Sequence, residues 1–358
     1  MRVILICLSL AICAPLGGRA QTAAPLGLFE GHADVGTVLH AGSVKYDAAR
    51  GTYTISGSGE NMWFASDAFQ FVWKKVSGDV TLAADISFIG SGGEEHRKAV
   101  LMVRQSLDAD SPYADVARHG NGLTSLQARD EKSANTAEIQ SAVSGPVRVR
   151  IAKRGDYFYF WVAGKGQDLQ FAGGSMKVPL HDPFYVGLGV CSHNKDAVET
   201  AVFSNVELST AAPSGSPVLY STLETVPLSG DRRVVYVTPG RITSATWTPD
   251  GKALIFERDG RREQIPLAGG TPEIITGGTA PPPAPADLSY HSPDGKQVAS
   301  LSFTGTEDRD TVLQVASLAD NTTKLLAKLV GGRGSLDAPP WSPDGLRLVF
   351  VSYQHLVP

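Results

Sequence analysis

The sequence predicts an all-β protein with two parts, an N-terminal two-sheet sandwich of jelly-roll type and a C-terminal partial β-propeller of about three blades. Three observations lead to this. Short runs rich in β-branched and aromatic residues recur between Gly, Asp, Ser and Pro, as in strands joined by turns. No stretch shows a convincing 3.6-residue period. One short segment is written three times, which is the mark of a repeat architecture.

Residues 1–20 have the pattern of an export signal. Arg2 precedes an apolar run, Val3–Cys13, that is too short to span a bilayer, and small residues stand just before Gln21. We expect cleavage before Gln21 and a periplasmic or secreted protein. A lipoprotein signal is the alternative, but Ile12 is bulkier than such signals accept before their cysteine. No later apolar run approaches the length of a membrane span.

Residues 21–208 are predicted to form the sandwich. From about Leu26 to Leu208 the chain reads as ten or more antiparallel strands, which suit two packed sheets. The clearest segments begin at Thr52, Phe69, Asp79, Arg97, Pro146, Asp156, Phe184 and Glu199. Residues 209–217, "STAAPSGSP", are small and turn-forming, so we interpret them as a linker.

Residues 218–358 carry the repeat. "WTPDGKALIFER", "HSPDGKQVASLSF" and "WSPDGLRLVFVSY" each place Pro-Asp-Gly between two apolar strands. Pro presets φ, Asp bonds the backbone beyond it and Gly accepts positive φ, so each triplet predicts the tight turn of a hairpin. The turn residues are Pro249, Asp250, Gly251, Pro293, Asp294, Gly295, Pro343, Asp344 and Gly345.

The other half of the unit also repeats, at Glu224, at Glu263 and more weakly at Leu313. One unit then has four strands over roughly 40 residues, which is the period of propeller blades. The chain supplies a half blade, two whole blades and the first half of another. We expect a truncated propeller that leaves strand edges unpaired and tends to self-associate. The alternatives are that the terminal halves pair, or that two chains complete a ring.

The repeated W-[ST]-P-D-G turn resembles the repeats of TolB-like (WD-type) β-propellers from bacterial periplasms, over about Val218 to Tyr353. That resemblance implies six-bladed rings and partners in the Tol–Pal envelope system. TolB proteins, however, have an α/β N-terminal domain where this chain has a sandwich. The signal is specific for fold and much less so for function, because propellers host many functions.

The segments "RKAVLMVRQSLDADSPYADV" and "VRVRIAKRGDYFYFWVAG" resemble concanavalin A-like sandwiches of the laminin-G and glucanase type. We expect the second segment to be a hairpin with Arg154 and Gly155 as its turn, which pairs Ile151 with Phe158 and Val149 with Phe160. That face is wholly apolar and belongs to the core.

The opposite face of the same hairpin interleaves guanidinium groups with aromatic rings. Two interpretations stay open: a platform on which sugar rings stack while arginine donates to their hydroxyls, or a sheet surface stabilised by cation–π pairs and covered by a loop or domain. The residues of this candidate glycan platform are Arg148, Arg150, Tyr157, Tyr159 and Trp161.

Catalytic and metal-binding patterns are not found in the sequence. Glu94 and Glu95 are adjacent, so they point to opposite faces, and Glu131 and Glu138 read as solvated charges. The chain has no GxSxG, P-loop, HExxH or CxxC pattern. Cys191, which is left alone after signal cleavage, reads as a buried structural thiol. We expect no enzyme activity, no cofactor and no metal.

Loss of the signal removes two of the 32 basic residues while the 36 acidic ones stay. An acidic chain of this kind lacks the electrostatic footprint of nucleic-acid binding. We therefore expect an exported, non-catalytic binding protein of the cell envelope, with glycan recognition by the sandwich and protein–protein interaction by the propeller. The alternative is the front part of a longer propeller-containing hydrolase, a peptidase or glycosidase, whose catalytic segment is absent.

Overall fold

The computed structural model describes residues 26–90, 93–276, 285, 288–303, 310–330 and 334–357. Regular structure in these ranges is β-strand throughout, so the predicted all-β class is confirmed. No helix in these ranges has the length and apolar character needed to cross a membrane. The predicted export signal and most of the Pro-rich stretch after Gly277 lie outside the described residues.

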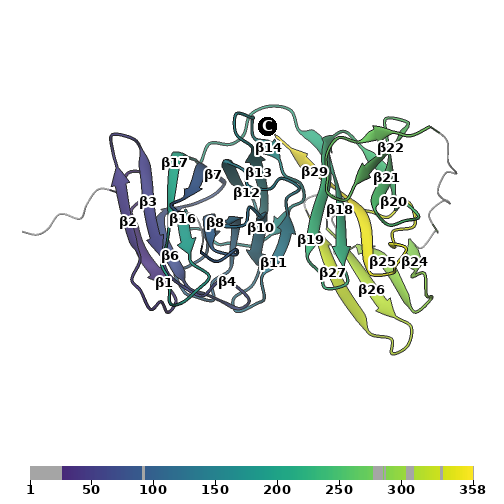
Figure 1. Ribbon diagram of the computed structural model, residues 1–358, viewed down its shortest axis with the longest axis horizontal. Coiled ribbons are helices and arrows are strands. Elements are labelled where there is room, and N and C mark those ends of the chain that lie inside the picture. The colour runs from purple at the N-terminus through teal and green to yellow at the C-terminus, as the bar shows by residue number, and fades with distance from the viewer. Residues whose placement is uncertain are drawn as a thin grey trace, which may run out of the picture.

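Two large sheets face each other in the N-terminal half (Figure 1). In spatial order the first sheet contains β1 (Gly31–Val35), β6 (Phe69–Val76), β16 (Phe184–Cys191), β8 (Lys98–Arg104), β9 (Tyr113–His119), β10 (Thr124–Arg129), β11 (Ala137–Gln140), β19 (Arg232–Pro239), β18 (Val218–Pro227), β29 (Arg347–Leu356) and β28 (Gly334–Ser335). The second contains β14 (Gln170–Phe171), β13 (Tyr157–Ala163), β12 (Arg148–Arg154), β7 (Val80–Phe88), β17 (Glu199–Ser209), β3 (Thr52–Gly57) and β2 (Ser43–Asp47), with β15 (Met176–Lys177) paired to β13.

The sandwich core lies between these sheets. Leu82, Ile151 and Phe160 come from the second sheet, Leu101 and Leu188 from the first, and all are buried. Alternation explains this, because every second residue of a strand points to the same face. The hairpin β4 (Met62–Trp63) and β5 (Ser66–Asp67) contributes to a smaller apolar cluster on the far face of the first sheet.

The β12–β13 hairpin has a different register from the one predicted. Ile151 pairs with Phe160 and Arg154 with Tyr157, so the turn is Gly155–Asp156 rather than Arg154–Gly155. Gly155 has φ 56, a value that a two-residue hairpin turn accepts readily from glycine at its first position. The error is two residues, and because strand faces alternate with period two, the predicted apolar and polar faces are unchanged.

The repeat region forms three four-stranded arrangements. One contains β20 (Ile242–Trp247), β21 (Ala253–Arg258), β22 (Arg261–Pro266) and β23 (Glu273–Ile274), and another contains β24 (Ser289–His291), β25 (Gln297–Phe303), β26 (Thr311–Ser317) and β27 (Thr323–Leu329). The third is made of β19, β18, β29 and β28. Figure 1 shows yellow β29 lying along green β18.

The expected unpaired edges of the terminal half blades are not found between β18 and β29. These strands pair antiparallel from Val218 opposite Leu356 to Pro227 opposite Arg347. The strands β19, β18, β29 and β28, which we call the shared sheet, pack on both neighbouring sheets. Phe350 packs against the β24–β27 sheet and Val351 against the β20–β23 sheet. Of the possibilities that the sequence left open, pairing of the terminal halves is the arrangement present.

Two tryptophans join the sheets of the repeat region. Trp247 Nε1 donates to the Pro340 carbonyl at 2.8 Å, and Trp341 Nε1 donates to the Tyr290 carbonyl at 2.8 Å. The indole of the first repeat therefore bonds the backbone just before the third repeat, and the indole of the third bonds the backbone just before the second. The corresponding position of the remaining repeat holds His291, which is exposed. A tryptophan hydrogen bond thus joins the shared sheet to each of its two neighbouring sheets.

The sandwich and the repeat region share one sheet. β17 ends at Ser209 and β18 begins at Val218, with no strand between them. Strand β11 of the sandwich nevertheless pairs in parallel with β19 of the repeat region, with Ile139 opposite Arg232. The connection expected to act as a linker therefore spans two parts that are hydrogen-bonded to each other through their backbones.

Candidate functional site

The five residues of the predicted glycan platform fall into two groups in the structure, because Arg148 and Tyr157 have partners of their own. Arg148 is held by two carboxylates, Asp85 at 2.9 Å and Glu207 at 3.0 Å, and also donates to the Asn205 carbonyl. Tyr157 faces the repeat region, where its hydroxyl donates to Asp310 at 3.4 Å. These two residues fit the structural interpretation of the hairpin face.

The other three platform residues lie together. Tyr159 and Trp161 pack with Phe171, and Leu356 and Tyr220 of the shared sheet join that cluster. Tyr159 is 6% exposed, so the repeat region covers much of the ring. Trp161 is half-buried, and the Arg150 guanidinium carbon lies 5.8 Å from its ring centre. These side chains line a groove of about 650 Å³, the junction groove, where the sandwich meets the repeat region.

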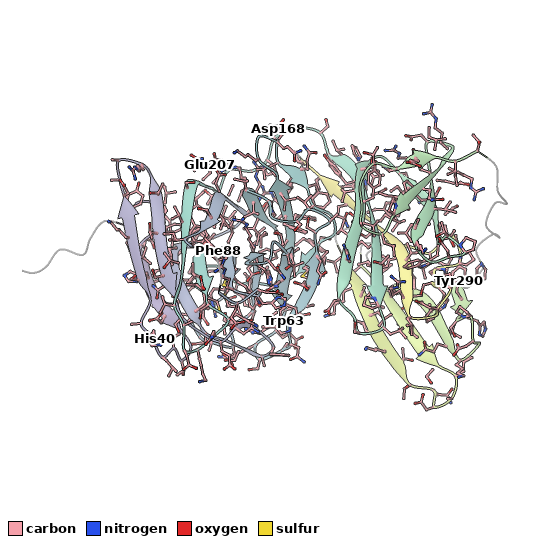
Figure 2. The ribbon with its side chains drawn as sticks, in the orientation of Figure 1. His40, Trp63, Phe88, Asp168, Glu207 and Tyr290 are labelled. Atoms are coloured by element: carbon pink, nitrogen blue, oxygen red, sulfur yellow. The ribbon has the colours of Figure 1, made fainter. Side chains whose placement is uncertain are left out.

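A second, polar depression lies on the far face of the first sheet, and the sequence did not predict it. This sandwich pocket has a volume of about 270 Å³. Its lining comes from four strands of the sheet, from the segment around β4 and from four loops. The lining residues are Asn61, Trp63, His96, Lys98, His119, Leu123, Gln127, Glu138, Gln140, His193 and Asp231. Figure 2 labels Trp63 at the lower side of the sandwich and Glu207, which lines the junction groove, at its upper side.

The floor of the sandwich pocket is a directional chain of hydrogen bonds. Lys98 Nζ, which can only donate, reaches the Gln127 amide oxygen at 3.2 Å, as well as Asn61 Oδ1 and the Met62 carbonyl. Gln127 must then present its amide nitrogen to Glu138 at 3.0 Å and to His119 Nε2 at 3.3 Å. The hydrogen-bond network thereby assigns the orientation of the amide.

The direction of this chain sets the histidine tautomers. His119 accepts at Nε2, so its Nδ1 carries the proton and donates to His96 Nδ1 at 3.3 Å. His96 is then protonated at Nε2, on an exposed ring. Burial, reinforced by the charge of Lys98, lowers the pKa of His119 to about 2, so His119 is neutral. The pocket therefore offers an N–H donor at His96.

Other groups in the pocket are free to meet a ligand. The Asn61 amide nitrogen and the Gln140 amide oxygen make no hydrogen bond to any described residue. The Trp63 ring is half-buried and lies 5.2 Å from Lys98 Nζ. An aromatic face beside fixed donors and acceptors is an arrangement that can hold a molecule with both an apolar face and hydroxyl groups.

The charges beneath the pocket are structural. Asp67 has no exposed side-chain surface and accepts from Arg129 at 2.8 Å and Arg104 at 3.4 Å. Asp115 is fully buried, and its oxygens have no hydrogen-bond partner among the described residues. Burial raises the pKa of Asp115 well above its usual value, which favours the neutral acid. Cys191 is buried, as expected from the sequence.

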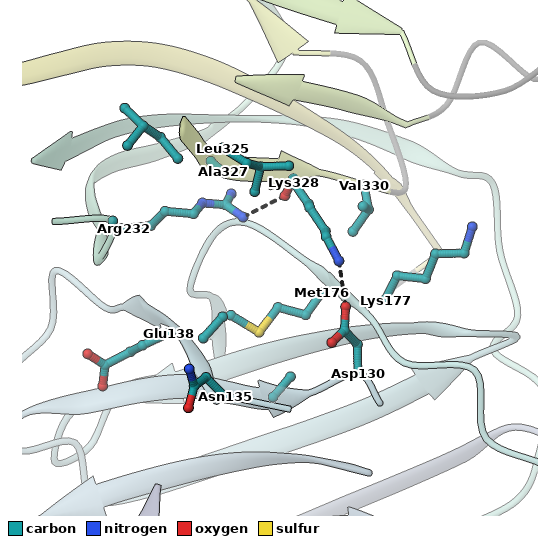
Figure 3. A pocket seen from close by; sticks show the side chains of 14 residues that line it. Asp130, Asn135, Glu138, Met176, Lys177, Arg232, Leu325, Ala327, Lys328 and Val330 are labelled. Carbon is teal, nitrogen blue, oxygen red and sulfur yellow. Dashed lines mark hydrogen bonds and ion pairs between the residues drawn. The ribbon is translucent and has the colours of Figure 1, made fainter. Parts of the chain in front are cut away.

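Glu138 was predicted to be a solvated surface charge, and this prediction is wrong. The side chain is 7% exposed, and it accepts hydrogen bonds from Gln127 at 3.0 Å and from Gln140 at 2.8 Å. It also lines a neighbouring cavity of about 220 Å³ between the sandwich and β27 (Figure 3). There Lys328 meets Asp130 at 2.5 Å, and Arg232 donates to the Lys328 carbonyl at 3.0 Å. These contacts join the repeat region to the part of the sandwich that borders the sandwich pocket.

The missed residues do leave a signal in the sequence. Lys98 and Arg104 stand six residues apart at the ends of "KAVLMVR", and Asp115 and His119 stand four apart in "YADVARH". Gln127 in "TSLQAR" pairs with Asp115 and so lies on the same face. Polar residues at even spacings in mainly apolar strands share one sheet face and predict that it is polar. Trp63 and Asp231 come from distant loops, and no local pattern places them there.

The repeated turns have nearly the same geometry three times. Asp250 accepts from Thr248 Oγ1 at 2.7 Å and from the Lys252 backbone N–H at 3.1 Å, and Gly251 has φ 67. Asp294 and Asp344 make the matching pairs of bonds with the residues two before and two after them. These hydrogen bonds lower the pKa of each of the three carboxyls. The side chains close the turns that Pro249, Pro293 and Pro343 begin.

No group of three or more His, Cys, Asp and Glu side chains in the described part of the chain is placed to hold a metal ion. His96 does lie near both other pocket histidines, with ring centres 5.5 Å from His119 and 5.6 Å from His193. The hydrogen bond between His96 and His119 uses the ring nitrogens that face each other.

Comparison with known proteins gives partial similarities. No family model matches the chain. An uncharacterised protein of Agrobacterium fabrum is 30% identical over 124 residues, which are 32% of this chain and 41% of that protein. The chain thus spans less than half the length of this relative.

Three solved structures illustrate the similarities of shape. A functionally unknown Saccharomyces cerevisiae protein has a TM-score of 0.38 at 17% identity, covering 48% of this chain and 93% of its own. A prokaryotic β-1,3-1,4-glucanase from a mouse hindgut metagenome has a TM-score of 0.30 at 12% identity, covering 45% and 80%. A putative TolB from Agrobacterium tumefaciens has a TM-score of 0.18 at 14% identity, covering 72% and 98%.

Proposed function

We propose that the chain is an exported, non-catalytic binding protein whose sandwich recognises a glycan in the sandwich pocket. The observation that supports this is the pairing of the half-buried Trp63 ring with a rigid hydrogen-bonded floor. One face of a sugar ring is apolar and can stack on an indole, while its hydroxyls both donate and accept. His96, Asn61 and Gln140 supply the matching groups.

The rigid floor favours recognition over chemistry. Gln127 is fully buried and uses its amide on Lys98, His119 and Glu138, so it positions its neighbours before any ligand arrives. Such preorganisation reduces the entropy lost on binding. Asp115, which lies on the same sheet face, is fully buried and out of reach of a substrate.

The test is binding of neutral oligosaccharides to the full chain on an array, followed by calorimetry. We expect Trp63→Ala to weaken binding by roughly tenfold, since an aromatic contact contributes about 0.5–1.5 kcal/mol beyond its buried area. Trp161→Ala, on the opposite side of the sandwich, is the matched control and should leave neutral-sugar binding unchanged. Equal losses of affinity in both variants would refute the proposal that the sandwich pocket binds a glycan. Failure of the intact chain to bind any neutral glycan would also refute it.

Glycoside hydrolysis in the same pocket is the second candidate. Burial and the nearby charge of Glu138 raise the pKa of Asp231, and both carboxyls line the pocket. A carboxylic acid with a raised pKa beside an ionised carboxylate is the pairing that glycosidases use. Release of reducing sugar that disappears in both Glu138→Gln and Asp231→Asn would support this candidate over simple binding.

For the repeat region we propose protein–protein interaction in the cell envelope. The edge strand β23 leaves both Glu273 and Ile274 exposed, with Ile274 at 59%. An exposed edge strand offers unpaired backbone groups to a partner. Cross-linking from a benzoylphenylalanine photoprobe at position 274, compared with one at the exposed Leu39, tests whether a partner contacts this edge. Equal yields at both sites would argue against it.

A further inference from the structure

The junction groove lies on the outer face of the second sheet, away from the sandwich pocket. Its floor comes from β7 and β12, and one wall comes from the aromatic side chains of β13. Its remaining sides come from residues 169–171, from Glu207 and Ser209 of β17, from residues 211–214, from Tyr220 and from the end of β29. The groove measures about 650 Å³, within the usual range for ligand sites, which often form where two parts of a protein meet.

Arg150 is the unusual residue of this groove. Its Nε is buried and has no hydrogen-bond partner, and no described carboxylate lies within 4.0 Å of its guanidinium. Arg148, two residues earlier on the same face, shows the contrast, because Asp85 and Glu207 both bind it. One of two neighbouring arginines is therefore satisfied within the protein, and the other is not.

Arg154 adds a second positive charge without a carboxylate. It donates to the Val80 and Lys153 carbonyls at 3.1 and 2.8 Å and to Thr81 Oγ1 at 2.7 Å, all neutral acceptors. Arg154 lies four residues after Arg150 on the strand, a span of roughly 13 Å. The charge of the groove floor is therefore positive along a distance longer than one side chain.

Small residues and aromatic rings line the floor and wall between the two guanidiniums. Ala152 lies between them on β12, with Thr81 opposite it on β7 and Tyr159 opposite it on β13. Ala83 and Trp161 flank Arg150 in the same way. A floor of methyl groups leaves room for a flat ring, and the aromatic wall supplies an apolar face for it.

We propose that the junction groove is a second binding site, for an acidic saccharide whose carboxylate pairs with Arg150 and whose ring lies against Trp161. Arginine presents a planar fork of donors that matches a carboxylate in bidentate geometry. The buried Nε–H of Arg150 lacks an acceptor, which is unfavourable, and a bound carboxylate would supply one. The aromatic wall favours a ring over a simple inorganic anion.

The electrostatics of the groove agree with this assignment. Burial lowers the pKa of Arg150, and the positive charge of Arg148 lowers it further, while Glu207 acts in the opposite direction. Burial likewise lowers the pKa of Arg154. The chain as a whole carries a formal charge of -4, so the positive groove is a local feature and provides no surface for a long nucleic acid.

The experiment titrates the full chain with oligogalacturonate and with oligomannuronate by calorimetry, at low and at high salt. We expect one of them to bind, binding to weaken as salt rises, and Arg150→Gln to raise Kd at least tenfold. Arg50→Gln removes the same charge from an exposed turn and should leave Kd unchanged. Trp63→Ala should also leave it unchanged, which separates this site from the sandwich pocket.

Any one of four results would overturn the proposal. The first is that neither uronate binds, and the second is that Arg150→Gln binds as the parent chain does. The third is equal binding of a carboxyl-reduced, neutral form of the same oligomer. The fourth is tighter binding of poly-glutamate. Because the neutral-glycan test depends on Trp63 and this one on Arg150, failure of either proposal leaves the other standing.

Discussion

The two sheets of the sandwich carry their charges in opposite ways. On the far face of the first sheet every buried cation has partners: Lys98 bonds three oxygens, and Arg104 and Arg129 share Asp67. On the outer face of the second sheet Arg148 is bound by two carboxylates, whereas the buried Nε of Arg150 has no hydrogen-bond partner. A satisfied charge organises the protein around itself, whereas a hydrogen-bond donor without an acceptor can still bind one. Arg150 is therefore the cation of the two faces whose role in stability we expect to be smallest.

The largest effect that this comparison predicts is at Asp67. Asp67→Ala would leave two buried guanidiniums without their carboxylate, and breaking a buried ion pair in this way typically destabilises a protein by about 3–5 kcal/mol. Urea unfolding of the variant and of the parent chain measures the difference. An exposed pair offers the control: Asp196→Ala removes the partner of Lys195, and the free energy of unfolding should barely change.

Lys98→Met is expected to come next. The substitution keeps the length of the side chain but removes the donor to Asn61, Gln127 and the Met62 carbonyl. Leaving buried acceptors without a donor costs roughly 2–3 kcal/mol. Thermal unfolding monitored by near-UV circular dichroism reports it. An unchanged transition would mean that the floor of the pocket is held by packing instead.

Acidification should weaken the first sheet by a similar or smaller amount. The pKa of His119 is about 2 in the folded state, far below the usual 6.5. Protons therefore bind the unfolded chain first, so the contribution of His119 to stability is complete above pH 6.5 and declines as pH falls toward 2. Between pH 7 and pH 5 the loss is about 2 kcal/mol.

His119→Gln tests that assignment, because glutamine does not titrate. The free energy of unfolding of the variant should fall less steeply between pH 7 and pH 5 than that of the parent chain. Parallel pH profiles for the two proteins would show that other groups, such as His193, control the acid response.

The smallest effect is expected at Arg150. Arg150→Met removes a guanidinium that has no carboxylate partner and lies 5.8 Å from the Trp161 ring centre, so stability should change by less than about 1 kcal/mol. The comparison with Lys98→Met is direct, since both replace a cation by methionine on a strand of the same sandwich. A loss as large as that of Lys98→Met would show that Arg150 supports the fold, and the contrast between the sheets would disappear.

The sequence predicted local features well. The all-β class, the core face of the β12–β13 hairpin and a buried Cys191 all follow from composition and from alternation along single strands. The exact register of that hairpin did not follow, because Arg154–Gly155 and Gly155–Asp156 are both plausible two-residue turns and glycine belongs to each.

Long-range pairing accounts for what sequence reasoning missed. Nothing near Val218 shows that its partner is Leu356, and nothing near Ile139 shows that β19 lies beside it. Glu138 looked solvated among polar neighbours, yet it is buried because Gln127 and Gln140 approach it from the same sheet. The hairpin platform failed as a whole surface for the same reason, since Leu356 and Tyr220 cover it from a distant segment.

The pairing of β18 with β29 has a consequence for the order of synthesis. β18 leaves the ribosome on the order of a hundred residues before its partner, which takes roughly 5–20 s at ordinary elongation rates. During that interval one edge of β18 has no strand beside it, while β11 can already hold β19 on the other side. We expect the last strand to close the shared sheet onto a sandwich that is already folded, and the interval before closure to be the period when the nascent chain most needs protection from aggregation.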